Sequence, residues 1–238
     1  MIELRTLGGL EIHRSEDGIP QAIPMQTKRL ALLAYLAAPH FHPLRRRDAV
    51  LGLFWPELDQ EHARGSLRQA LHALRQALGD GAIVTRGEEE IGLDPALVSS
   101  DVDRMETAMR AGKPAEALAI YTGDFLDGVF IADAAPELEE WMAEIRARLR
   151  HAAAKAAWAA ADPSSGRGET GEFVRRAVAL SGDNERALRR GLGILERLGD
   201  RAGAMALYEE FRERIRRGLG IEPSDETKAY VRAIRSGQ

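Results

Sequence analysis

The spacing of hydrophobic positions changes along the first hundred residues. In "IELRTLGGLEIH" (residues 2–13), apolar and polar residues alternate in two short runs separated by Gly8 and Gly9, which is typical of a half-buried β-hairpin. A second alternating run, "AIVTRGEEEIGL" (residues 82–93), predicts another hairpin that turns near Gly87. Strands are therefore expected at both ends of this part of the chain.

Between the hairpins, apolar residues recur at helical spacing. The segment "KRLALLAYLAA" follows Thr27, a residue type that can cap a helix, and ends before Pro39. A second helix is expected from about Arg45 to Trp55, because Pro56 closes it and its apolar residues share one face.

A third helix is predicted from a cap at Asp59 to Leu78. Gly79 suits its end because glycine tolerates the left-handed conformation found there. Strands, three helices and a closing hairpin within about 100 residues predict a winged helix-turn-helix, which we place at residues 1–98.

After Asp101 the chain is rich in Ala, Leu, Glu and Arg at helical spacing, with no strand pattern. Helices are expected at residues 101–111, 114–122, 136–161, 169–181, 184–198, 200–217 and 224–235. "GKPAEALAIY" and "GDRAGAMALYEEF" both place a glycine turn before small residues and a Tyr, which favours stacked helical repeats. The predicted fold is therefore mainly α, with an N-terminal winged helix-turn-helix of the α+β type followed by an all-α, TPR-like domain over residues 99–238.

The third predicted helix has two distinct faces. Its leucines form one stripe, which is expected to be buried: Leu67, Leu71, Leu74 and Leu78. An adjacent stripe carries Arg64, Arg68, His72 and Arg75, with Gln69 beside it. Residues 62–79 contain no acidic residue.

Charge is distributed unevenly along the chain. The whole sequence has 33 Lys and Arg against 37 Asp and Glu, a net charge of −4. Residues 26–87 have nine against five, a net of +4, which leaves the remainder at −8. A solvated face remains one interpretation of the basic stripe, but such faces usually mix charges. Contact with DNA phosphates also explains why acids are absent.

A DNA-binding interpretation identifies candidate residues by their place in a helix-turn-helix. The candidates for reading bases lie in the N-terminal half of the third helix: Arg64, Ser66, Arg68 and Gln69. Further candidates, mainly for contact with phosphate, are Thr27, Lys28, Arg29, Arg45, Arg46, Arg47, His72 and Arg75. The run at residues 45–47 is equally well explained as a solvated surface. Arg86, in the expected wing, could enter a minor groove, although the adjacent "GEEE" would repel DNA.

Other classes of protein fit the sequence poorly. The chain has no Cys, its six His are scattered, and no pair of carboxylates is singled out by its setting. We therefore expect no enzymatic activity, no cofactor and no metal site. No stretch approaches 18 consecutive apolar residues, so a cytoplasmic location without membrane contact is expected.

Several longer stretches resemble a known family in order and spacing. They are "LGGLEI", "TKRLALLAYLA", "LFWPELDQEHARGSLRQALHALRQALGD", "DVDRMETAMRAGKPAEALAIY" and "GDRAGAMALYEEFRERIRRGLGIEPSDET". The chain resembles transcriptional activators of the Streptomyces antibiotic regulatory protein type, which join an OmpR-like winged helix to a bacterial transcriptional activator domain. The resemblance implies that the first domain binds double-stranded DNA, usually at direct repeats. It also implies that the second domain contacts RNA polymerase or a second copy of the chain.

Two interpretations of function remain open at this level. The first is a DNA-binding transcriptional regulator, which the resemblance makes an activator. The second is a scaffold for protein interactions whose winged helix does not bind DNA, which the overall negative charge favours. The resemblance also leaves open that the chain is the front part of a longer regulator.

Overall fold

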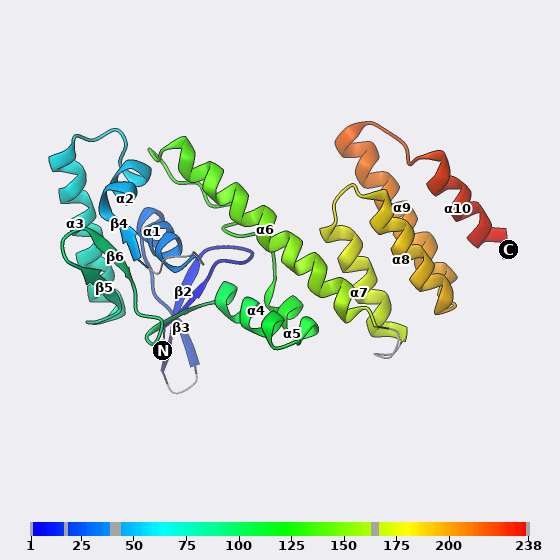
Figure 1. Ribbon diagram of the computed structural model, residues 1–238, viewed down its shortest axis with the longest axis horizontal. Coiled ribbons are helices and arrows are strands. Elements are labelled where there is room, and N and C mark those ends of the chain that lie inside the picture. Colours follow the sequence, from blue (N-terminus) through cyan, green and yellow to red (C-terminus); the bar gives the residue numbers. More distant parts are fainter. Residues whose placement is uncertain (1, 17–18, 39–43, 163–166, 237–238) are drawn as a thin grey trace. The chain divides into compact units, whose positions relative to one another are not determined.

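The computed structural model describes residues 2–16, 19–38, 44–162 and 167–236 (Figure 1). The chain forms two compact units. The first consists of Met1–Ala111 and Ala119–Leu149, and the second of Gly112–Leu118 and Arg150–Gln238. Strands occur in the first unit and helices in both, so the predicted fold class is confirmed.

The first unit has two small sheets. One sheet contains β1 (Ile2–Arg5), β2 (Glu11–Glu16), β3 (Ile19–Ala22) and β7 (Val98–Ser100), in the order β3-β2-β1-β7. The other contains β4 (Leu44–Arg46), β5 (Ile83–Arg86) and β6 (Glu90–Leu93), in the order β4-β6-β5. The β1–β2 and β5–β6 pairs are antiparallel, and Gly87 has a φ of +58° between β5 and β6, so both predicted hairpins are confirmed.

Three helices lie between the hairpins: α1 (Thr27–Ala37), α2 (Arg47–Phe54) and α3 (Gln60–Leu78). Two predicted details are wrong. Gln26, not Thr27, occupies the cap position of α1, and it makes no capping hydrogen bond through its side chain. Arg45 and Arg46 belong to β4, because this segment pairs with β6, so α2 begins only at Arg47. The predicted stop at Pro39 lies outside the described residues.

The helix α3 forms as its sequence predicts. Its N-cap Asp59 accepts a hydrogen bond from the backbone N–H of His62 at 2.9 Å, and Gly79 ends it with a φ of +96°. The predicted leucine stripe is buried. Arg14 of β2 donates from Nη2 to the carbonyl of Ala77 at 2.6 Å, which ties the last turn of α3 to the first sheet.

The first unit extends beyond the predicted winged helix. The helix α4 (Asp101–Arg110) follows β7, and the buried carboxylate of Asp101 accepts hydrogen bonds from the backbone N–H groups of Thr6 and Leu7 at 2.7 and 2.8 Å. Trp141 packs edge-on against Tyr35 and Phe125, with ring centroids 4.9 and 5.7 Å apart. Residues 119–149 therefore share a core with the winged helix.

The remaining helices are α5 (Pro114–Ile120), α6 (Pro136–Ala160), α7 (Arg167–Leu180), α8 (Glu185–Arg197), α9 (Arg201–Leu219) and α10 (Asp225–Ser236). Each begins or ends within a few residues of its predicted position. In the second unit, α8 packs against α7, α9 and α10 around a core that includes Leu188, Leu192 and Phe211. None of the helices among the described residues is long and apolar enough to cross a membrane.

Candidate nucleic-acid interface

The exposed flank of α3 carries the predicted polar residues. Arg64, Arg68, Gln69 and His72 are exposed, and Ser66 and Arg75 are half-buried. Within the part of the chain that the structure describes, the three arginines of this flank form no ion pair. Their guanidinium groups therefore remain available to an outside anion.

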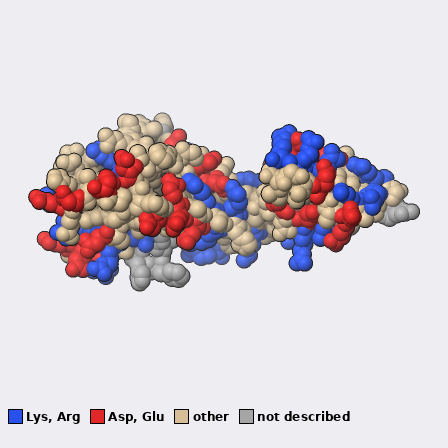
Figure 2. Space-filling view, turned by 90° about the horizontal axis from the view of Figure 1, so that it is seen from above, with Lys and Arg blue, Asp and Glu red and all other residues tan. Residues whose placement is uncertain are grey.

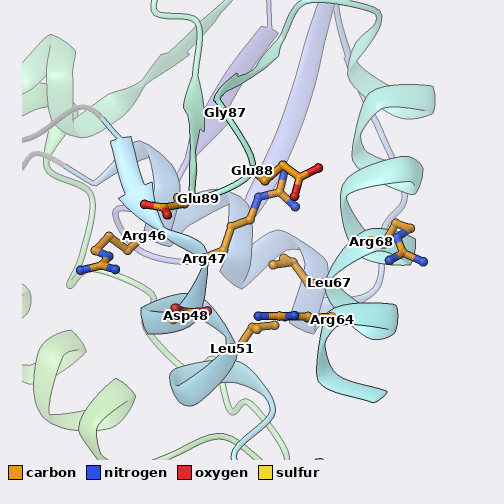
Figure 3. Close-up of a pocket in the computed structure, with 10 residues that line it drawn as sticks. All are labelled: Arg46, Arg47, Asp48, Leu51, Arg64, Leu67, Arg68, Gly87, Glu88 and Glu89. Carbon is orange, nitrogen blue, oxygen red and sulfur yellow. The ribbon is translucent and has the colours of Figure 1, made fainter. Parts of the chain in front are cut away.

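A hollow of about 590 Å³ lies between α2, α3 and the tip of the β5–β6 hairpin (Figure 3). We call it the first hollow. Its basic lining residues are Arg46, Arg47, Arg64 and Arg68, and its acidic ones are Asp48, Glu88 and Glu89. Figure 3 shows that Arg64 extends from α3 toward α2, whereas Arg68 points away from α2. The first hollow therefore combines four cations from three elements with acids at its rim.

A second hollow, of about 660 Å³, surrounds the first two turns of α3. It is lined by Leu58, Gln60, Glu61, His62, Arg64, Gly65, Ser66, Arg68 and Gln69. Arg64 and Arg68 line both hollows, so they lie at the centre of the surface. All four predicted base-reading residues are brought together here.

The three consecutive arginines at residues 45–47 have different surroundings. Arg45 lies over the ring of Tyr35, with its guanidinium carbon 4.8 Å from the ring centroid. Burial lowers the pKa of Arg45 below its usual value, and the nearby Tyr35 opposes this change. Arg46 and Arg47 instead line the first hollow, and the backbone N–H of Arg47 donates to the carbonyl of Glu89 at 2.7 Å.

The other candidates do not line either hollow. Lys28 donates to the carbonyl of Asp133 at 3.4 Å, and its ammonium group lies 5.6 Å from the ring centroid of Trp55. Thr27 is exposed and Arg29 is half-buried in the first turn of α1. Arg86 forms an ion pair with Glu90 across the hairpin at 3.3 Å.

Sequence reasoning missed the contribution of the hairpin tip to this surface. Gly87, Glu88 and Glu89 line the first hollow because β4, which directly precedes α2, pairs with β6. A strand of three residues has too little alternation to be recognised from its sequence. On the face drawn in Figure 2, acidic side chains are also prominent over the first unit, in keeping with its sequence.

The described residues offer no group of three or more His, Asp or Glu side chains that could hold a metal ion. Apart from its carboxylates, this surface offers guanidinium, amide, hydroxyl and imidazole groups. Such groups recognise anions and the hydrogen-bonding edges of bases.

Comparison with known proteins identifies a family that the chain matches and a solved structure with a similar fold. Residues 93–235 match the model of the bacterial transcriptional activator domain. The fold is similar to that of Mycobacterium tuberculosis EmbR, solved in complex with a low-affinity phosphopeptide, with a TM-score of 0.61 and 19% sequence identity. The similarity covers 100% of this chain and 65% of the EmbR chain. No curated protein matches the chain in sequence.

The family match covers more than half of the 238 residues, and the fold comparison includes both the winged helix and the helical region. The predicted resemblance to regulators of the Streptomyces antibiotic regulatory protein type is confirmed. The chain belongs to the bacterial transcriptional activator domain family, a family of transcription regulators rather than of enzymes.

Proposed function

We propose that this protein is a sequence-specific DNA-binding activator that places α3 in a major groove. The observation that carries the proposal is the flank of α3, where Arg64 and Arg68 line both hollows and form no ion pair with a described residue. An internal salt-bridge network on this flank would have argued against DNA binding.

The residue types on this flank and beside it suit the two tasks of a recognition helix, which are reading base edges and contacting phosphates. Arg can contact guanine through two hydrogen bonds, and Gln can contact adenine in the same way. Arg64, Arg68 and Gln69 lie in the N-terminal half of α3, which is the half that usually meets base edges. We assign contact with phosphates on one side of the groove to Arg46 and Arg47, which lie at the junction of β4 and α2.

Family membership supports a second part of the proposal. A transcriptional activator acts on RNA polymerase, and the family match at residues 93–235 includes most of the helical second unit and none of α3. We infer that this unit contacts RNA polymerase and that two copies of the chain occupy direct repeats in DNA. A footprint that covers a single half-site at saturation would contradict the dimer.

DNA binding is tested by selecting bound fragments from random duplexes and measuring affinity by fluorescence anisotropy. Arg64→Ala/Arg68→Ala is expected to weaken binding at least about thirtyfold, since each base contact by Arg is worth about 1–3 kcal/mol. For Arg46→Ala/Arg47→Ala, the slope of log K against log salt is expected to fall by about one for each lost phosphate contact.

The matched control is Arg110→Ala/Arg148→Ala, which removes two exposed arginines from the same unit but away from α3. This variant should bind DNA nearly as well as the parent. If the parent shows no salt-sensitive binding to any duplex, the scaffold interpretation replaces the DNA-binding one.

A further inference from the structure

The helix α8 presents a second cationic surface, in the unit that does not contain α3. Arg186, Arg190 and Arg197 are spaced four and seven residues apart, so they project from one side of the helix. All three are exposed, and none forms an ion pair with another described residue. We call these three residues the α8 arginine face.

Some other arginines of α8 and α9 are neutralised within the protein. Arg189 pairs with Glu185 and Glu226, at 3.6 and 3.2 Å. On α9, Arg216 and Arg217 pair with Glu213 at 2.9 and 2.8 Å. The arginines of this unit therefore differ in whether they are paired, and its residues 150–238 contain 17 Lys and Arg against 13 Asp and Glu, a net of +4.

Two aromatic rings flank the α8 arginine face. The guanidinium carbon of Arg190 lies 4.2 Å from the ring centroid of Trp158 on α6, which holds that guanidinium in one orientation. Tyr230 of α10 approaches the face itself at Gly193, which lies between Arg190 and Arg197 on the same side of α8, and a Cβ atom there would lie only 2.9 Å from the Tyr230 hydroxyl. Both rings are packed partly against the core, so they present fixed apolar edges beside the cations.

The spacing of the three arginines indicates how far apart the acidic groups of a bound chain would lie. At 1.5 Å per residue, Arg190 lies about 6 Å along the helix from Arg186 and about 10 Å from Arg197. An extended chain advances about 3.3 Å per residue, so carboxylates two and three residues apart would match these intervals.

Acidic residues border the face and disfavour a wide polyanion. Glu185 and Glu226 lie beside Arg189, and Glu196 lies 3.4 Å from the Tyr230 hydroxyl. A DNA duplex carries a charge about every 1.7 Å along its axis and would bring phosphates close to these carboxylates. A single extended peptide is narrow enough to contact the arginines alone.

We propose that the α8 arginine face binds an extended acidic segment of a partner protein, with carboxylates paired to Arg186, Arg190 and Arg197 and an apolar side chain against Trp158 or Tyr230. Planar guanidinium groups bind carboxylates through paired hydrogen bonds. This binding does not depend on contact between α3 and DNA, because the two surfaces lie in different units.

The test measures binding of a fluorescently labelled peptide to the full chain at low salt, without DNA. The peptide carries glutamates two and three residues apart and one Phe, and a second peptide replaces each Glu by Gln. Arg186→Ala/Arg197→Ala is expected to weaken binding of the acidic peptide about tenfold, whereas the Gln peptide should bind poorly to every variant. Circular dichroism confirms that the variant is folded.

The matched control is Arg216→Ala/Arg217→Ala, which removes two arginines from α9 in the same unit. It should change peptide affinity less than twofold. Equal binding by all three proteins, or no binding by the parent, overturns the proposal. If the α8 substitutions weaken binding to a DNA duplex but not to the peptide, the face is a nucleic-acid contact and the proposal is also overturned.

Discussion

Residues of the same type have different roles in this protein because their neighbours differ. Arg64 and Arg68 form no ion pair with a described residue, Arg45 lies over Tyr35, and Arg86 pairs with Glu90. Arg86 must give up its ion pair before it can bind phosphate, and Arg45 is half-buried over the Tyr35 ring. Arg64 and Arg68 avoid this cost, which makes them the strongest candidates for contact with DNA.

At the same scale, Asp59 controls the first turn of α3. Its Oδ1 accepts from the His62 backbone N–H at 2.9 Å, and its Oδ2 lies 2.6 Å from Nδ1 of His62. The backbone hydrogen bond is the main cause that lowers the pKa of Asp59 below 3.8, followed by the hydrogen bond from the His62 side chain, because both stabilise the carboxylate.

A lowered pKa makes this cap sensitive to acid. Its contribution to stability is fully present above the ordinary value of 3.8 and is lost as the pH falls through the lower folded value. We expect the His62 amide to lose its hydrogen-bonded chemical shift and its protection from exchange in that range, as measured by NMR. Asp59→Asn keeps a capping oxygen without this titration, so its His62 amide should not show the transition. An identical transition in both proteins would contradict the assignment.

At the scale of elements, the wing brings acids close to the recognition helix. Glu88 and Glu89 line the first hollow opposite Arg64 and Arg68, because the pairing of β4 with β6 places the hairpin tip beside α2. If α3 binds DNA, these carboxylates repel phosphates and reduce affinity.

Glu88→Gln/Glu89→Gln is therefore expected to tighten DNA binding severalfold at low salt, with a smaller gain as salt screens the repulsion. The backbone hydrogen bond between Arg47 and Glu89 persists in this variant because it involves no side-chain atom. Anisotropy titrations at several salt concentrations measure the change. The control is Glu137→Gln/Glu140→Gln on α6, in the same unit. An equal gain in the control would mean that net charge, rather than the wing, is responsible.

Helix packing gives a second prediction at this scale. It concerns two helical glycines, one closely packed and one with open space around it. A Cβ atom on Gly191 of α8 would lie 2.9 Å from Val178 and 3.1 Å from Val174, whereas one on Gly65 of α3 would meet nothing within 4 Å. Gly191→Ala should reduce the free energy of unfolding by about 1–3 kcal/mol, because α7 must shift. Gly65→Ala should increase it by about 0.5–1 kcal/mol, because alanine favours the helix. Urea denaturation measures both, and a stabilised Gly191→Ala would disprove the close packing.

At the scale of the whole molecule, the first compact unit includes more than the winged helix. Asp101 binds the end of β1, and Trp141 packs on Tyr35 of α1. The backbone N–H of Ala135 also donates to the carbonyl of Leu53 in α2 at 2.9 Å. These contacts come from residues that follow the predicted boundary at residue 98.

A fragment of residues 1–149 is therefore expected to be more stable than a fragment of residues 1–98, by at least about 2 kcal/mol. The shorter fragment exposes apolar surface on Tyr35 and leaves the N–H groups of Thr6 and Leu7 without their buried acceptor. Urea denaturation followed by circular dichroism compares the two. Equal stability would support residues 1–98 as a self-sufficient domain.

The sequence by itself determined the features that depend on near neighbours in the chain. Helix ends follow from local residues such as Asp59 and Gly79, and the leucine stripe of α3 follows from helical periodicity. The acid-free cationic flank is also local, because one helix turn places Arg64 and Arg68 on the same side. These features could be predicted because each depends on residues a few positions apart.

Only the tertiary structure decided which candidates share a surface. Arg46 and Arg47 join Arg64 at the first hollow, whereas Arg45 packs on Tyr35. The pairing of β4 with β6 and the packing of Trp141 likewise join residues far apart in sequence. Contacts of this kind depend on how complete elements fit together in space, and the periodicity of a single segment carries no information about that fit.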